Sequence, residues 1–143
     1  MLKYVEYTVG KGAKRPYKKY AGDAGWDLFI SRPCDIAPGE TVDVHTDLQI
    51  SMPPKTYARI TGRSSTLRKL GLMVYEGIID NGYTGEMFVC VHNLGKETFH
   101  AEPGMRLAQV IFGTIEDVRW SEVEEISPDP RKRGNNGFGS TGR

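Results

Sequence analysis

A series of turn-forming pairs constrains the fold most, because it divides the chain into short segments. Glycine, proline and asparagine mark turns through their backbone preferences, and the pairs are Pro38-Gly39, Pro53-Pro54, Asn81-Gly82 and Pro103-Gly104. The segments between them are rich in β-branched and aromatic residues, and they are too short for long helices. Many short strands at this spacing predict a sandwich, a barrel or a jelly roll.

The clearest strand signal is TVDVHTDLQI at residues 41–50. Apolar and polar residues alternate there, and Val42, Val44, Leu48 and Ile50 fall on one side. This period of two predicts one half-buried strand. Further strands are expected in YVEYTV (4–9), TYARIT (56–61), MFVCVHNL (87–94) and RLAQVIF (106–112).

One stretch, SSTLRKLGL at residues 64–72, has helical character. Ser64 or Ser65 can cap its start, and Gly71 can end it in the left-handed conformation. The stretch is too short to organise the fold. It is therefore expected to form a single short helix on an all-β domain.

The composition fits one soluble domain. The chain has 143 residues, of which 26% are charged and 38% hydrophobic. It has no apolar run long enough to span a membrane and no secretory leader at its start, so we expect a cytoplasmic protein without a membrane partner. Cys34 and Cys90 are isolated and are expected to be buried free thiols, which weakly favours a reducing compartment.

Charge is distributed unevenly along the chain. Residues 1–20 hold six Lys or Arg and one Glu, residues 21–130 are acidic overall, and residues 131–143 hold four Lys or Arg and no acid. Basic ends can contact nucleic acid, remain solvated, or bind a phosphate. The last thirteen residues contain four Gly, and Phe138 is their only large apolar residue, so they cannot fold alone. They are either a loose tail or a closing flap that carries Arg133.

An aspartate with unusual surroundings follows a short apolar pair. Ile78 and Ile79 indicate a buried strand, and Asp80 stands between them and the Asn81-Gly82 turn. Tyr83 follows the turn. A carboxylate at such a point serves either turn chemistry or catalysis, and the local pattern leaves both open.

Three other short stretches carry polar groups with two possible roles each. Asp27 follows a turn of small residues and is either a turn cap or a ligand. Arg63, Ser64 and Ser65 lie at the helix start, which suits an anion as well as an ordinary cap. Gln109 interrupts an apolar strand, where it either satisfies a backbone group or binds a ligand.

Taken together and in order, these stretches resemble the five motifs of the trimeric dUTPase family, the deoxyuridine triphosphate pyrophosphatases. They are AGWDL at 24–28, GRSS at 62–65, GIIDNGYTGE at 77–86, GMRLAQVIF at 104–112 and RGNNGFGSTG at 133–142. The resemblance implies an all-β, jelly-roll-like barrel or sandwich that forms a homotrimer. It also implies a β domain at 1–130 and a flexible glycine-rich arm at 131–143 that closes over an active site of its own or a neighbouring subunit.

The resemblance implies a hydrolase that converts dUTP to dUMP and pyrophosphate by attack of water at the α-phosphorus. Such an enzyme limits uracil in DNA and supplies dUMP. Asp80 would be the general base, and Tyr83 would pack under the deoxyribose and exclude a 2′-hydroxyl. Uracil would be recognised by the backbone around three residues, Gly77, Ile78 and Met87.

The resemblance also implies, from the matching motif positions, which residues bind the phosphates and the metal. The phosphates would be bound by Arg63, Ser64, Ser65 and Gln109. Arg133 would contact the γ-phosphate, and Phe138 would close over uracil. Asp27 would hold Mg²⁺ through its waters, which agrees with the few protein ligands that this ion needs.

Two alternatives remain beside this interpretation. A dCTP deaminase shares the fold, but its catalytic glutamate lies ten residues after the position of Asp80, and Cys90 stands there in this chain. The second alternative is a protein that keeps the fold and contacts nucleic acid or a regulatory protein through its basic segment 1–20. A salt-sensitive gel shift with DNA would support that role.

Overall fold

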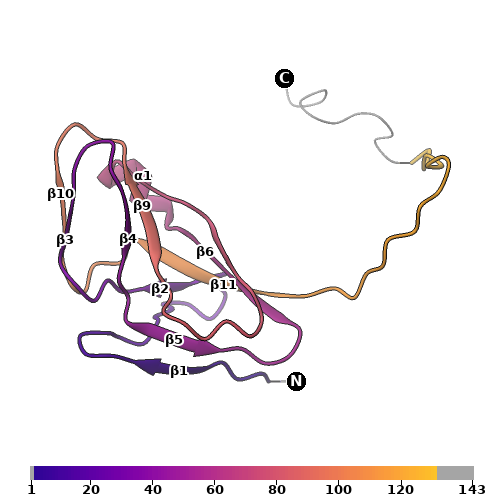
Figure 1. Ribbon diagram of the computed structural model, residues 1–143, viewed down its shortest axis with the longest axis horizontal. Coiled ribbons are helices and arrows are strands. Elements are labelled where there is room, and N and C mark those ends of the chain that lie inside the picture. Colours follow the sequence, from indigo (N-terminus) through magenta and orange to yellow (C-terminus); the bar gives the residue numbers. More distant parts are fainter. Residues whose placement is uncertain (1, 132–143) are drawn as a thin grey trace.

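Short antiparallel strands make up almost all regular structure in residues 2–131, the part that the computed structural model describes (Figure 1). The strands are β1 (Glu6–Val9), β2 (Trp26–Leu28), β3 (Cys34–Ile36), β4 (Thr41–Val44), β5 (Leu48–Ser51), β6 (Thr56–Gly62), β7 (Leu72–Val74), β8 (Gly77–Ile79), β9 (Val89–Asn93), β10 (Phe99–Ala101) and β11 (Ala108–Thr114). The single helix of these residues is α1 (Ser64–Leu70).

The strands form two larger sheets and two strand pairs. One sheet has the order β2-β11-β6-β8 and the other the order β4-β9-β7, while β1 pairs with β5 and β3 with β10. Every pairing is antiparallel. The inner faces bury a shared apolar core that includes Ile36, Leu72, Val91 and Ala108, each fully buried. The prediction of an all-β, jelly-roll-like fold with one short helix is confirmed.

The segment 41–50 differs from its prediction as one strand. It forms two strands, β4 and β5, because the backbone bends at Asp47, which adopts a φ of 51°. The Thr46 hydroxyl donates to the carbonyl of Met87 at 2.6 Å. The backbone N–H groups of Thr46 and Asp47 donate to the carboxylate of Glu86. These contacts with a distant segment replace the ladder bonds of a continuous strand.

The structure confirms the predicted C-terminal cap of the helix and corrects the predicted N-terminal cap. Gly71 ends α1 with a φ of 67°, in the left-handed region as predicted. The residue at the N-cap is Arg63, and its side chain makes no capping hydrogen bond. Ser64 and Ser65 therefore lie inside the first turn, one and two positions after the cap. The buried Thr66 hydroxyl ties the helix to the body by donating to the carbonyl of Leu107 at 2.7 Å.

The turn after β8 is confirmed, although the strands on its two sides do not pair with each other. Tyr83 N–H donates to the Asp80 carbonyl at 3.1 Å, and Gly82 has a φ of 97°. However, β8 pairs with β6, whereas β9 pairs with β4 and β7. The chain thus crosses from one sheet to the other between residues 80 and 88. The Asn81 side chain fixes the turn by donating to two backbone carbonyls, those of Pro53 and Thr56.

The two cysteines are free and half-buried, so they are less enclosed than predicted. Partial burial raises the pKa of the Cys34 thiol and that of the Cys90 thiol. Both thiols therefore stay protonated near neutral pH and are poor nucleophiles.

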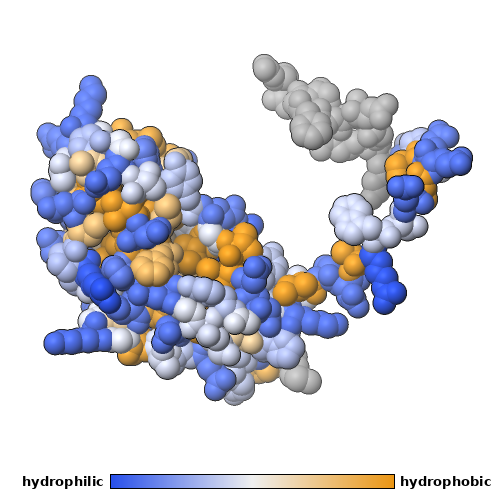
Figure 2. All heavy atoms as spheres, in the orientation of Figure 1, coloured by the Kyte–Doolittle hydropathy of each residue, from blue (hydrophilic) through white to orange (hydrophobic). Residues whose placement is uncertain are grey.

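After β11 the chain leaves the body and runs outward as an irregular segment (Figure 1). Apolar side chains lie along this segment, apart from the body (Figure 2). They are Val118, Trp120, Val123 and Ile126, and Trp120 is 100% exposed. Across residues 2–131, no helix has the length and apolar character needed to cross a membrane.

Candidate active site

A cavity of about 520 Å³ lies beside β2, β11 and the start of α1. The strand register brings its walls together, since Gln109 on β11 is paired with Asp27 on β2 and with Thr61 on β6. Four residues predicted from the sequence line it, namely Asp27, Arg63, Ser64 and Gln109. Four basic side chains and two acidic ones line the cavity, so its excess charge is positive and suits an anion.

Asp27 lies between two arginines. Its Oδ1 is 3.1 Å from Arg63 Nε, and its Oδ2 is 3.2 Å from Arg106 Nη1. Arg63 Nη1 also donates to the carbonyl of Arg106 at 2.9 Å. One carboxylate thus orients two guanidinium groups, whose planar forks match phosphate oxygens.

Arg106 was missed by reasoning from the sequence, although it lies within the GMRLAQVIF stretch. Its guanidinium carbon is 5.7 Å from the ring centre of Tyr17 and 5.9 Å from that of Phe29. The available signal was its basic side chain three residues before Gln109 in an otherwise apolar strand.

The basic segment near the N-terminus also contributes to the cavity, through Lys18 and Lys19. Lys18 Nζ lies 4.6 Å from the ring centre of Trp26. The uneven charge of residues 1–20 pointed to a phosphate contact as one option. It did not identify these two lysines.

Gln109 is held by two glycines. Its Nε2 donates to the carbonyl of Gly62 at 3.1 Å. A β-carbon at Gly25 would overlap the Gln109 side-chain oxygen and come within 3.0 Å of its Cδ. Glycine at position 25 therefore allows the amide to lie flat between β2 and β6.

We expect Gly25→Ala to lower the affinity of the cavity for a nucleoside triphosphate by about 10-fold, because the methyl group displaces the Gln109 amide. Isothermal titration with a non-hydrolysable dUTP analogue measures the change. Gly22→Ala is the control, because a β-carbon at Gly22 meets nothing within 4 Å. Equal affinities of the two variants would contradict a role of Gln109 in binding.

Asp80 and Tyr83 lie away from this cavity and do not line it. β2 and β8 are the two edges of one four-stranded sheet. The edges are separated by three interstrand spacings, roughly 14 Å. A single subunit thus does not bring Asp80 to the cavity that contains Asp27.

The segment around Asp80 offers exposed groups at a sheet edge. Ile78 is 57% exposed and Tyr83 43% exposed, although both have large apolar surfaces. Among the strands of residues 2–131, β8 pairs with β6 alone, so half of its backbone groups face away from the sheet. Met87 differs, since its side chain is fully buried and its N–H donates to the carbonyl of Leu48 at 2.9 Å. The backbone N–H of Met87 is therefore not free for a base.

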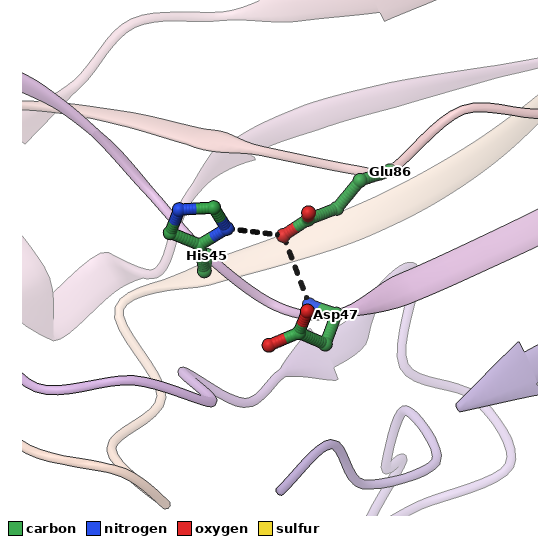
Figure 3. A group of neighbouring side chains, drawn as sticks. All are labelled: His45, Asp47 and Glu86. Atoms are coloured by element: carbon green, nitrogen blue, oxygen red, sulfur yellow. Dashed lines mark hydrogen bonds and ion pairs between the residues drawn. The ribbon is translucent and has the colours of Figure 1, made fainter. Parts of the chain in front are cut away.

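A second polar cluster contains His45, Asp47 and Glu86, whose ligand atoms lie within 4.8 Å of one another (Figure 3). Glu86 accepts from His45 Nδ1 at 2.9 Å and from two backbone N–H groups. Asp47 accepts from Ser31 at 2.6 Å and from Arg32 at 2.7 and 2.9 Å. These oxygens are occupied by proton donors, so the cluster fits a hydrogen-bond network and not a Mg²⁺ site.

Asp27 suits Mg²⁺ better than this cluster does, with water between its carboxylate and the ion. A carboxylate has about four acceptor sites, and the two arginines use two of those on Asp27. The remaining sites can accept hydrogen bonds from metal-bound water. Mg²⁺ commonly binds through one or two carboxylates together with substrate phosphates.

The hydrogen bonds of Asp47 make the free energy of unfolding depend on pH in the acid range. Hydrogen bonds from Arg32 and then from Ser31 lower the pKa of Asp47 to about 2. Because the folded pKa lies below the unfolded value of about 3.9, the stabilisation is present above pH 4 and is lost as pH falls toward 2. We expect Asp47→Asn to melt a few degrees lower than the parent at pH 7, with a difference that shrinks between pH 4 and pH 2.

Asparagine suits this test because it also tolerates a positive φ. Asp43→Asn, a change at an exposed residue of β4, serves as control. Calorimetry from pH 2 to pH 7 gives both curves. A difference for Asp47→Asn that stays constant over this range would argue against the ion pair.

Arg133 and Phe138, the predicted phosphate and uracil contacts of the C-terminal segment, lie outside the described residues. Ser65 lies on α1 next to the cavity-lining Ser64. The structure therefore groups Asp27, Arg63, Ser64 and Gln109 in one place. It puts Gly77, Ile78, Asp80 and Tyr83 in another.

The fold and cavity define an all-β protein with an arginine-lined anion site. A sequence model of the family described as dUTPase matches residues 11–142, and the chain belongs to this family. A deoxyuridine 5′-triphosphate nucleotidohydrolase from Clostridium novyi (strain NT) is 40% identical over 143 residues, which cover 99% of each chain.

Solved structures are similar as well. The dUTPase of Staphylococcus bacteriophage 80alpha with dUPNHPP has a TM-score of 0.84 and 26% identity, covering 98% of this chain and 99% of that one. A mutant dUTPase from phage phi11 of S. aureus, studied for the coordination of a structural Mg(II) ion, has a TM-score of 0.80 and 23% identity. It covers 87% of this chain and 99% of that one.

Proposed function

We propose that the protein is a dUTP diphosphatase that hydrolyses dUTP to dUMP and pyrophosphate. The observation that carries the proposal is the cavity of a dUTPase-family chain in which Asp27 orients Arg63 and Arg106. Two aligned guanidinium groups, a hydroxyl and an amide suit the oxygens of a triphosphate. The Clostridium novyi relative, a deoxyuridine 5′-triphosphate nucleotidohydrolase, supports the same activity.

In this proposal the residues of the site have separate roles. Arg63, Arg106, Ser64 and Gln109 bind and orient the phosphates. Asp80 from the sheet edge accepts the proton of the attacking water, which adds to the α-phosphorus while pyrophosphate leaves. Positioning and charge stabilisation supply most of the rate. The free backbone groups of β8 near Gly77 and Ile78 recognise uracil.

Mg²⁺ fits this reaction at Asp27. Bound there through water, the ion would neutralise phosphate charge and help to orient the triphosphate. The Mg(II) studied in the phage phi11 dUTPase supports use of this ion in the family. Arg63 and Arg106 would hold the phosphates beside the ion.

Assembly of three copies is part of the proposal. Asp27 and Asp80 belong to opposite edges of one sheet, so a complete site needs the Asp80 edge of a second subunit. The exposed apolar segment that contains Trp120 supports contact between copies. Light scattering should give three times the 16.0 kDa chain mass, and a stable monomer would refute the assembly.

A pyrophosphate-release assay with dUTP, dCTP, dTTP and UTP, with and without Mg²⁺, tests the activity. We expect release from dUTP alone and a strong dependence on Mg²⁺. Ammonia release from dCTP would instead indicate a deaminase. Absence of any product from dUTP would refute the proposed function.

A further inference from the structure

The ring of Tyr83 is folded back onto the two residues that follow its turn. Its hydroxyl donates to the carbonyl of Glu86 at 2.8 Å. A β-carbon at Gly85 would come within 2.6 Å of that hydroxyl and 2.7 Å of the ring carbon Cζ. The ring therefore occupies space that exists only because residue 85 is glycine.

The carbonyl that holds Tyr83 belongs to a residue that is itself fixed. The Glu86 carboxylate, 19% exposed, accepts hydrogen bonds from the His45 ring and from the N–H groups of Thr46 and Asp47 (Figure 3). On the other side of Glu86, the side chain of Gln49 donates to the carbonyl of Thr84 at 3.1 Å. These bonds hold residues 84–86 against the start of β5.

The bend at residues 45–47 is fixed to the body in turn. Ser31 N–H donates to the carbonyl of His45 at 3.0 Å, and the Ser31 hydroxyl donates to the Asp47 carboxylate. Arg32 forms two hydrogen bonds to the same carboxylate. A continuous set of bonds thus runs from the segment before β3 to the hydroxyl of Tyr83. When the residues that contact a side chain are themselves held by hydrogen bonds, that side chain keeps its geometry within a narrow range.

We propose that Gly85 and Glu86, which the bend at 45–47 holds in place, fix the position of the Tyr83 ring; we call these two residues the mount. The position of the ring in turn determines how strongly the protein discriminates deoxyribose from ribose. This inference rests on the proposed function and on the expectation from the family resemblance that Tyr83 packs under the deoxyribose. Gly85 and Glu86 are positioning residues, since they act through the ring. Excluding a hydroxyl requires the ring to stay within a fraction of an ångström of its place, which a free tyrosine side chain would not do.

Gly85→Ala separates this role from a structural one. Gly85 has no positive φ, and the three atoms nearest to the added methyl group all belong to the far end of the Tyr83 side chain, so the fold should tolerate it. We expect the ratio of kcat/KM for UTP to that for dUTP to rise about 10-fold or more. The melting temperature of Gly85→Ala should change little. Gly22→Ala, with open space around its β-carbon, is the matched control.

Two further variants complete the test. Tyr83→Phe removes the hydrogen bond to Glu86 and keeps the ring, and it should raise the same ratio by a smaller factor. Tyr83→Ala should raise it most. If Tyr83→Ala raises the ratio while Gly85→Ala and Tyr83→Phe leave it at the parent value, the mount is refuted and the proposed function stands. If the parent releases no pyrophosphate from dUTP, the proposed function itself fails.

Discussion

Changing Asp80 to asparagine is expected to lower kcat for dUTP hydrolysis by about 10²–10⁴-fold, the usual contribution of a general base. Asparagine has nearly the same shape but cannot accept the proton of the attacking water. The backbone turn should persist, because the Asp80 carbonyl still accepts from Tyr83 N–H and the Asn81 amide still binds two carbonyls. The loss should therefore fall on kcat and spare dUTP affinity.

Single-turnover kinetics and titration with a non-hydrolysable dUTP analogue separate the two quantities. Asp43→Asn removes a carboxylate from an exposed site on β4 and should leave both unchanged. Asp80→Asn with kcat within threefold of the parent would show that Asp80 is not the base. A loss of affinity equal to the loss of kcat would point to a binding role instead.

Removal of residues 131–143 is expected to reduce kcat by about 10³–10⁵-fold, the range known for arginines that stabilise a phosphoryl-transfer transition state. The segment contains Arg133 and Phe138, for which the family resemblance implies contacts with the γ-phosphate and with uracil. Its composition lacks the apolar side chains of a core, so the melting temperature should hardly change. The dUTP affinity should fall less than kcat, because Arg63 and Arg106 remain.

Arg131→Ala provides the matched control for charge in this segment. Arg131 pairs with Asp129 at an exposed site, so its loss should leave kcat unchanged. Arg133→Ala should account for most of the effect of the deletion. Near-normal turnover of the shortened chain would mean that residues 131–143 take no part in catalysis. A large drop in melting temperature would assign them a structural role.

The sequence by itself determined the features that depend on neighbouring residues. Turn pairs and β-branched runs predicted the short strands, and Gly71 predicted the end of α1, because these preferences act within a few bonds. The ordered motifs identified Asp27, Arg63, Ser64 and Gln109, which the structure brings to one cavity. Such motifs carry information because residue type and spacing are both constrained by the same chemistry.

Only the tertiary structure decided the features that depend on distant contacts. The period-two pattern at 41–50 gave no sign of the bend at Asp47, since that bend is stabilised by Glu86, about forty residues away. The local pattern at residues 77–83 gave no sign of which strand β8 pairs with, and its pairing with β6 puts Asp80 and Tyr83 at the sheet edge opposite Asp27. Arg106, two residues before β11, entered the site through its contact with Asp27 on β2. Local preferences cannot encode these arrangements, because each depends on which strands meet when the common core is buried.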